Sequence, residues 1–232
     1  MIPPRFVALF DLDGTLVASA GGSPSAGLLA MNLAAERLTG RRGLGDPAEF
    51  AGRTDLQIAR MLLAAGGADG GDATAVAELI RIYVSELERA IPSRPYVALG
   101  DPAGAVRALA AIGGIVGLGT GNVPRGAALK LESAGIAGLF DMARGGYGDD
   151  GDERHEVLAT GARRCDPTGA LPVVIIGDTP RDVAAARAIG AACVGIPFLE
   201  NTAEVLRSAG AEAILPAVGP ELAKIVPAFI EP

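Results

Sequence analysis

Carboxylate side chains placed where buried strands should end are the residues of this sequence best suited to chemistry. Asp11 and Asp13 lie two positions apart in FDLDGTL, directly after the apolar run RFVAL. Asp178 and Asp182 lie in GDTPRD, at the end of the run PVVIIGD, and Thr120 ends the run GIVGLGT. Without a nearby cation or phosphate, four such acids would repel one another and raise their own pKa values. The set therefore indicates a site for a divalent cation.

Magnesium fits these acids, because it prefers oxygen ligands and commonly takes a carboxylate or two together with water and a substrate phosphate. A carboxylate beside magnesium, here Asp11, can attack phosphorus and form an aspartyl-phosphate. Asp13 should point to the same pocket, since side chains alternate along an extended chain, and it can protonate a leaving alcohol and then activate water. The backbone amides of two turns, DGT and TGN, can hold phosphate oxygens; these turns include Gly14, Thr15, Gly121 and Asn122.

The elements that must position these residues follow from the hydrophobic pattern. Short apolar runs bounded by turn residues predict strands covered on both faces, at 5–10, 114–120, 172–178 and 191–197. Apolar residues at three- and four-residue spacing predict helices between and after these strands, at 102–112, 124–134, 153–164, 181–189 and 202–209. This alternation predicts an α/β fold with a doubly wound, Rossmann-like parallel sheet. Ligands bind at the carboxyl ends of such strands, where the acids lie.

The interval 17–94 breaks the alternation of strands and helices. It offers helical segments near 24–39, 55–65 and 73–90, separated by Gly-rich turns, and no convincing strand. We therefore expect an α/β core domain made of 1–16 and 95–232, with a small all-helical cap domain, 17–94, inserted after the first strand.

Composition narrows the class of protein. The chain has 232 residues, half of them apolar, and a formal net charge of -7, which argues against a nucleic-acid surface. No uninterrupted apolar stretch reaches the roughly 18 residues that a membrane span needs.

Cys165 and Cys193 are far apart and fit buried thiols in a reducing cytoplasm, so we expect a cytoplasmic protein. The single histidine, His155, lies in a charged stretch, which disfavours a catalytic triad or a histidine-bound zinc. The oligomeric state stays open.

The motifs DLDGTL, TGN and GDTPRD, in this order and spacing, resemble the first, second and fourth motifs of the haloacid dehalogenase-like hydrolase superfamily. The chain resembles phosphatases of the phosphoglycolate phosphatase type, which carry a helical cap after the first motif. The resemblance implies that Asp11 is the nucleophile, that Asp13 is the general acid/base, and that the hydroxyl of Thr120 binds the transferring phosphoryl group. It implies a magnesium site in which Asp178 is a direct ligand, Asp182 a supporting acid and the backbone carbonyl of Asp13 a further ligand, so that the metal set is Asp11, Asp13, Asp178 and Asp182.

Members of this superfamily also use a basic residue, often a lysine in a Lys-Pro dipeptide, which this sequence lacks. The corresponding stretch, GGYGDDGDERHEV, offers Arg154 instead. The other candidate is Lys130, on the helix after TGN; it is one of only two lysines among 20 basic residues. We favour Lys130 as the catalytic cation, with its side chain folding back toward the start of its helix.

An acid at position 13 favours phosphoester chemistry, because the relatives that attack carbon or cleave phosphonates lack it. The prediction is a magnesium-dependent phosphatase that hydrolyses a small phosphomonoester through an aspartyl-phosphate on Asp11. The alternatives are a phosphosugar mutase on the same core and a catalytically idle binding protein. A response-regulator receiver is disfavoured, because its acids lie differently and it has no insertion of this length.

The cap contains one candidate for substrate recognition, Arg53 in the stretch AGRTD. In similar capped phosphatases this loop faces the pocket, so Arg53 could bind a substrate carboxylate or a second phosphate. The alternative is a polar turn in which Asp55 caps the next helix. The sequence does not identify the substrate.

Overall fold

The computed structural model describes residues 3–20, 24–44 and 47–230, and most of its strands form one six-stranded sheet. The strand order is β5-β4-β1-β6-β7-β8 and every neighbouring pair is parallel. The bounds are β1 (Phe6–Phe10), β4 (Gly114–Gly119), β5 (Gly145–Gly146), β6 (Val173–Gly177), β7 (Ala192–Gly195) and β8 (Ala213–Ile214). The chain winds outward in opposite directions from β1, so the predicted doubly wound α/β sheet is confirmed.

Both faces of the sheet are covered by helices. Val7 and Leu9 of β1 pack in one apolar cluster, and Phe6, Ala8 and Phe10 pack in another on the opposite face, as alternation along a strand requires. The cluster of Val7 includes residues of α7 (Arg154–Cys165), α8 (Pro180–Ala188) and α9 (Ala203–Ala209). The cluster of Phe6 includes residues of α5 (Pro102–Ala111), α6 (Pro124–Ser133) and α10 (Leu222–Ile225), with α11 (Pro227–Ile230) beside it. The predicted strands and helices of the core are confirmed to within a few residues.

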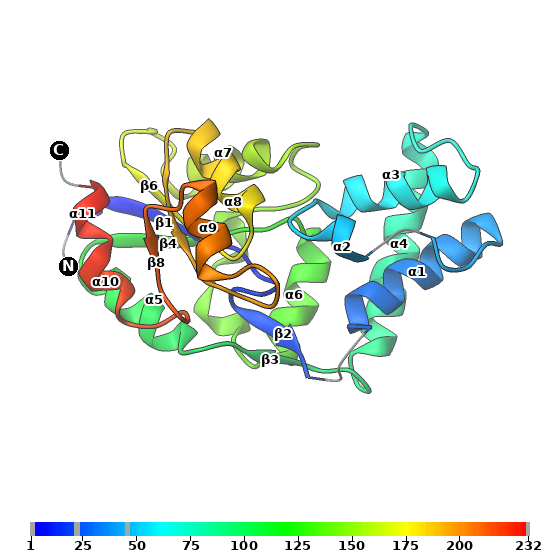
Figure 1. Ribbon diagram of the computed structural model, residues 1–232, viewed down its shortest axis with the longest axis horizontal. Helices are drawn as coiled ribbons and strands as arrows, with labels where there is room; N and C mark the ends of the chain where they lie inside the picture. The colour runs from blue at the N-terminus through cyan, green and yellow to red at the C-terminus, as the bar shows by residue number, and fades with distance from the viewer. Residues whose placement is uncertain (1–2, 21–23, 45–46, 231–232) are drawn as a thin grey trace.

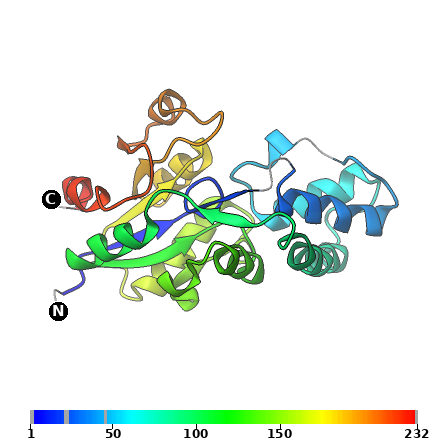
Figure 2. The same ribbon diagram turned by 90° about the horizontal axis from the view of Figure 1, so that it is seen from below.

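Four further helices lie at one end of the molecule, away from the sheet (Figures 1 and 2). They are α1 (Ala26–Thr39), α2 (Pro47–Phe50), α3 (Asp55–Ala65) and α4 (Ala73–Ala90). The three long ones match the helices expected near 24–39, 55–65 and 73–90. The division into a core domain and a cap domain with boundaries at 16/17 and 94/95 stays a prediction. Among the described residues, no helix is long and apolar enough to cross a membrane.

The interval predicted to be free of strands nevertheless contains one. β2 (Val17–Ser19) pairs antiparallel with β3 (Tyr96–Ala98), where the chain leaves the sheet and returns to it. The expectation of an all-helical insertion is therefore wrong at its first residues. Each strand has three residues and its partner lies far away in the sequence, so a local hydrophobic pattern does not reveal the pair.

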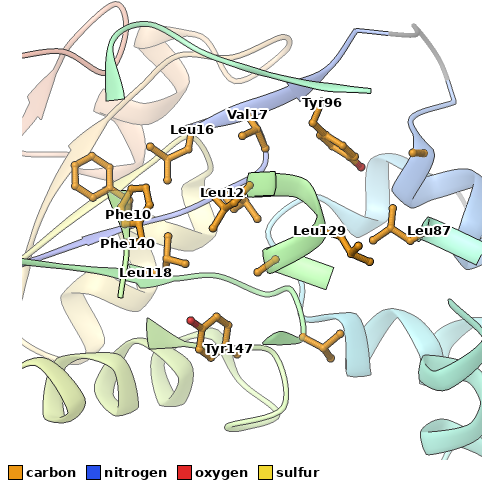
Figure 3. Close-up of a cluster of buried hydrophobic side chains, with 14 of the residues drawn as sticks. Phe10, Leu12, Leu16, Val17, Leu87, Tyr96, Leu118, Leu129, Phe140 and Tyr147 are labelled. Atoms are coloured by element: carbon orange, nitrogen blue, oxygen red, sulfur yellow. The ribbon is translucent and has the colours of Figure 1, made fainter. Parts of the chain in front are cut away.

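One apolar cluster joins the sheet to the four helices (Figure 3). Leu12 and Leu16, in the turn after β1, are fully buried in it, together with Val17. Leu129 of α6 and Leu87 of α4 belong to the same cluster, together with Tyr96 (Figure 3). Continuous apolar packing thus attaches the four helices to the turn after β1 and fixes their position beside the sheet.

Candidate active site

The first motif forms a tight turn at the carboxyl end of β1. The amide of Asp11 still bonds to the Ile176 carbonyl at 2.8 Å, and the chain then folds so that the Gly14 amide donates to the Val17 carbonyl at 2.9 Å. Gly14 has a φ of 84°, and a Cβ at this position would collide with the carboxylate of Asp178. The Gly14 amide, predicted to bind phosphate, is thus already used within the turn. The role of Gly14 here is conformational and allows close approach.

A cavity of about 420 Å³ opens at the carboxyl ends of the central strands, between the sheet and the helices α1 and α3. Most of the residues singled out from the sequence line it: Asp11, Asp13, Gly14, Arg53, Thr120, Gly121, Asn122, Lys130, Arg154 and Asp178. Two do not. Thr15 and Asp182 are fully buried, and Thr15 donates to Asp178 Oδ1 at 3.3 Å while Asp182 supports Arg154. His155, by contrast, is exposed on α7, as expected.

Arg154, at the first position of α7, is buried between two carboxylates. Its Nη2 lies 2.5 Å from Asp11 Oδ1 and 2.7 Å from Asp182 Oδ1, and it also donates to the Gly119 carbonyl at 2.9 Å. Burial raises the pKa of Asp11 to about 6; Arg154 opposes this shift, and the negative charges of Asp182 and Asp13 add to it. The guanidinium therefore offsets only part of the charge that these acids bring into the interior.

Asp182 was predicted to support a metal ion, which stays a prediction; in the structure both oxygens of its carboxylate accept hydrogen bonds. Its Oδ1 accepts from Arg154, and its Oδ2 accepts from the amide and hydroxyl of Thr179, at 3.1 and 2.6 Å. Thr179 is the N-cap of α8 and forms a capping box with Asp182. Both carboxylate oxygens are thus occupied by protein donors, so Asp182 anchors Arg154 and the start of α8.

Asp11, Asp178 and Asp182 form a buried group in which one carboxylate oxygen of each lies within 4.8 Å of the others. Burial raises the pKa of Asp178 to about 9, with further contributions from the negative charges of Asp11, Asp182 and Asp13. A buried carboxylate with so little neutralising positive charge around it is typical of a binding site for a hard cation. The donor set fits Mg²⁺, with Asp11 and Asp178 as the carboxylates that would hold it. The carboxylate of Asp13 does not belong to this group, and the predicted ligation through its backbone carbonyl stays a prediction.

Lys130 folds back into the cavity and contacts Asp13. Its Nζ lies 2.6 Å from Asp13 Oδ2 and 2.6 Å from Asn122 Oδ1. Burial alone would lower the pKa of Lys130, but Asp13 and the nearby Tyr96, Tyr83 and Asp55 hold it well above its usual value. Lys130 is therefore a permanent cation, placed to hold Asp13 in position.

The amide of Asn122 extends this network to Thr120. Its Nδ2 donates to Asp13 Oδ2 and to Thr120 Oγ1, both at 2.8 Å. The turn after β4 is in this way tied to the turn after β1 by side-chain hydrogen bonds.

The two basic candidates therefore occupy different places. Arg154 contacts Asp11 and Lys130 contacts Asp13. The sequence treats them as alternatives for one position, whereas the structure brings both to the cavity. The assignment of Lys130 as the catalytic cation stays a prediction.

The cavity is also lined by residues that the sequence analysis did not single out. Tyr83 of α4 and Phe198, in a loop after β7, line it, and they lie in segments with no motif around them. Arg53 lines it as expected, with its Nε donating to the Glu49 carbonyl at 2.7 Å. Asp55, by contrast, is not the helix cap: the N-cap of α3 is Thr54, in a capping box with Gln57.

Residues 7–190 match the family described as haloacid dehalogenase-like hydrolase. A curated protein of Dickeya dadantii (strain 3937), named "Probable phosphatase IndB", is 25% identical over 213 residues, which cover 90% of this chain and 88% of that protein.

Solved structures share the fold. A hydrolase from Pseudomonas syringae superposes with a TM-score of 0.71 at 17% identity, covering 98% of this chain and 100% of that one. CbbY from Rhodobacter sphaeroides, in complex with phosphate, superposes with a TM-score of 0.70 at 18% identity, covering 94% of this chain and 96% of that one.

Replacing Arg154 by Met should destabilise the protein by about 3–5 kcal/mol, because Asp11 and Asp182 would stay buried without their partner. Lys130→Met should cost less, since the side chain of Asp13 is 46% exposed and water can solvate it. The matched control is Arg163→Met on the same helix, an exposed site where about 0.5 kcal/mol or less is expected. Urea unfolding measures all three. Equal stability of Arg154→Met and Arg163→Met would contradict this description of the site.

Without Mg²⁺, the protein should lose stability as the pH rises from about 4 to about 9. The pKa of Asp178 is raised from 3.8 to about 9 on folding, so in this range the folded state binds more protons than the unfolded state. Asp178→Asn should flatten the profile. A Mg²⁺ concentration of about 100 times Kd should stabilise the wild type by about 2.7 kcal/mol, and the variant much less. Thermal unfolding at several pH values, with and without Mg²⁺, tests this; identical profiles for the two proteins would exclude Asp178 as the responsible acid.

Proposed function

This chain belongs to the haloacid dehalogenase-like hydrolases, and we propose that it is a Mg²⁺-dependent phosphatase that hydrolyses a small phosphomonoester through an aspartyl-phosphate on Asp11. One observation carries the proposal. Asp11 lines a cavity at the carboxyl ends of the central strands, with a cation, Arg154, on one of its oxygens and a second buried acid, Asp178, beside it. The name of the Dickeya dadantii relative supports the phosphatase assignment.

In the first step, an oxygen of Asp11 attacks phosphorus, and the bond from phosphorus to the alcohol oxygen breaks. Arg154 holds Asp11 Oδ1, which leaves Oδ2 as the attacking atom. Bound Mg²⁺, held by Asp11 and Asp178, would supply positive charge to the phosphoryl oxygens. Thr120 lies at the same edge of the sheet and would donate its hydroxyl to one of these oxygens.

Asp13 is proposed to transfer the proton in both steps. The bonds from Lys130 and Asn122 both end on its Oδ2, which leaves Oδ1 for the substrate. Protonated Asp13 gives its proton to the departing alcohol oxygen. It then accepts a proton from the water that attacks phosphorus, and Asp11 leaves as a free carboxylate. The overall reaction consumes one water and releases the alcohol and inorganic phosphate.

Arg53 is proposed to recognise a second anionic group on the substrate. It lines the cavity, and its segment precedes α3. Arg181 lies close to Arg53: burial lowers the pKa of Arg181, and the positive charge of Arg53 adds to that shift. Two neighbouring guanidinium groups favour an anion between them. Comparing esters with and without a carboxylate or second phosphate, for wild type and Arg53→Ala, tests this assignment.

Turnover of para-nitrophenyl phosphate tests the proposed function. The wild type should release phosphate with Mg²⁺ and not with EDTA, and Asp11→Asn should be inactive because it lacks the nucleophile. Asp13→Asn should lose about 10²- to 10⁴-fold in kcat, the usual contribution of a general acid/base. Asp166→Asn is the matched control, since this aspartate bonds to Thr168 and the Leu171 amide outside the cavity. Undiminished turnover in purified Asp11→Asn would refute the mechanism, and transfer of phosphate between sugars in place of release would indicate a mutase.

A further inference from the structure

We propose that Asp55, a cap residue, is a positioning residue for the phosphate-binding turn, by which we mean residues 120–123. The inference rests on the proposed function and extends it, because it assigns to the cap a part in shaping the core side of the site. Asp55 is 6% exposed and is the first residue of α3. It touches the turn and not the acids that hold the metal, so it would act through Thr120 and Asn122.

Two hydrogen bonds of Asp55 hold this turn. The Asp55 amide donates to the Gly121 carbonyl at 2.7 Å, and the Val123 amide donates to Asp55 Oδ2 at 2.9 Å. Val123 is the N-cap of α6, and its side chain has no oxygen to accept a hydrogen bond. The acceptor at the start of α6 therefore comes from another part of the chain, and its negative charge faces the positive end of the helix dipole.

The cap loop and the turn approach so closely that no side chain fits between them. A Cβ on Gly121 would collide with the Arg53 carbonyl, and a Cβ on Gly148 would collide with the Gly121 carbonyl. Neither glycine has a positive φ, so glycine is required here because a side chain has no room, not because of the backbone conformation. Glycine at position 121 is what the direct backbone contact between cap and core requires, and glycine at position 148 lets a neighbouring core segment approach the same turn.

The side chains carried by the turn are those proposed to bind the phosphoryl group and to hold Asp13. Thr120 is fully buried and Asn122 is 5% exposed, and they bond to each other. A displacement of the turn would therefore move the hydroxyl of Thr120 and the support of Asp13 together. A misplacement of about 1 Å in such a site lowers the rate by about 10²-fold.

The kinetic test compares Asp55→Ala with Asp55→Asn, which keeps an oxygen to accept from Val123. Acetyl phosphate is the diagnostic substrate, because it is too small to need the cap. Asp55→Ala should lower kcat for acetyl phosphate and para-nitrophenyl phosphate alike, by about 10²-fold, and weaken inhibition by inorganic phosphate. Asp55→Asn should restore most of both. Unchanged turnover of acetyl phosphate by folded Asp55→Ala would overturn the proposal and leave Asp55 a contact that only closes the cap.

Arg60→Ala is the matched control, because it removes another contact of α3 with the core, the 2.5 Å ion pair to Asp152. It should leave turnover of acetyl phosphate unchanged. Gly121→Ala disturbs the same cap contact from the core side and should reproduce the loss, which keeps the proposal testable if Asp55→Ala does not fold. Full activity of Gly121→Ala would count against it.

A measurement that needs no turnover separates this inference from the proposed function. Hydrogen exchange at the Val123 amide, followed by NMR, should be faster in Asp55→Ala than in wild type, Asp55→Asn and Arg60→Ala. Calorimetry with inorganic phosphate and Mg²⁺ should show weaker binding by the same variant. If the wild type hydrolyses no substrate, hydrogen exchange and phosphate binding still test the positioning role of Asp55. Equal exchange and equal phosphate binding in all four proteins would overturn the positioning role.

Discussion

The site depends on one buried cation held between two carboxylates. Arg154 comes from the start of α7, Asp11 from the end of β1, and Asp182 from the first turn of α8. Each of these charges would be strongly unfavourable in the interior alone. Together they fix the relative positions of three elements that are far apart in the sequence. Asp182 also bonds to Thr179, so the start of α8, and with it Asp178, is held by the same set of contacts.

This arrangement leaves the negative charge at the cavity floor only partly compensated. The pKa values of Asp11 and Asp178, raised to about 6 and about 9, express that imbalance. A second cation, Lys130, is committed to Asp13 at the other side of the floor. One basic residue thus contacts the proposed nucleophile and one the proposed acid/base, and the proposed metal ion would lie near Asp178.

The sequence predicted what depends on local pattern. The buried strands have short apolar runs bounded by turn residues and the acids follow them directly, so the doubly wound parallel sheet and the gathering of Asp11, Asp13 and Asp178 at one cavity could be inferred. Contacts between distant segments could not. The pairing of β2 with β3, the capture of Asp182 by Arg154 and the contact of Asp55 with Val123 each depend on tertiary packing that no periodicity encodes. The sequence treated Lys130 and Arg154 as alternatives, whereas the fold brings both side chains to the cavity.

Trapping the phosphorylated enzyme tests the central claim, attack by Asp11 on phosphorus, most directly. Asp13→Asn keeps the nucleophile but lacks the base that activates water, and acetyl phosphate needs no proton for its leaving group. The variant would be mixed with acetyl phosphate and Mg²⁺, quenched in acid and digested, and the peptides analysed by mass spectrometry. The expected result is a phosphoryl group on Asp11. A phosphoryl group on Thr120 or another residue, or wild-type turnover with no phosphorylated residue at any quench time, would contradict it.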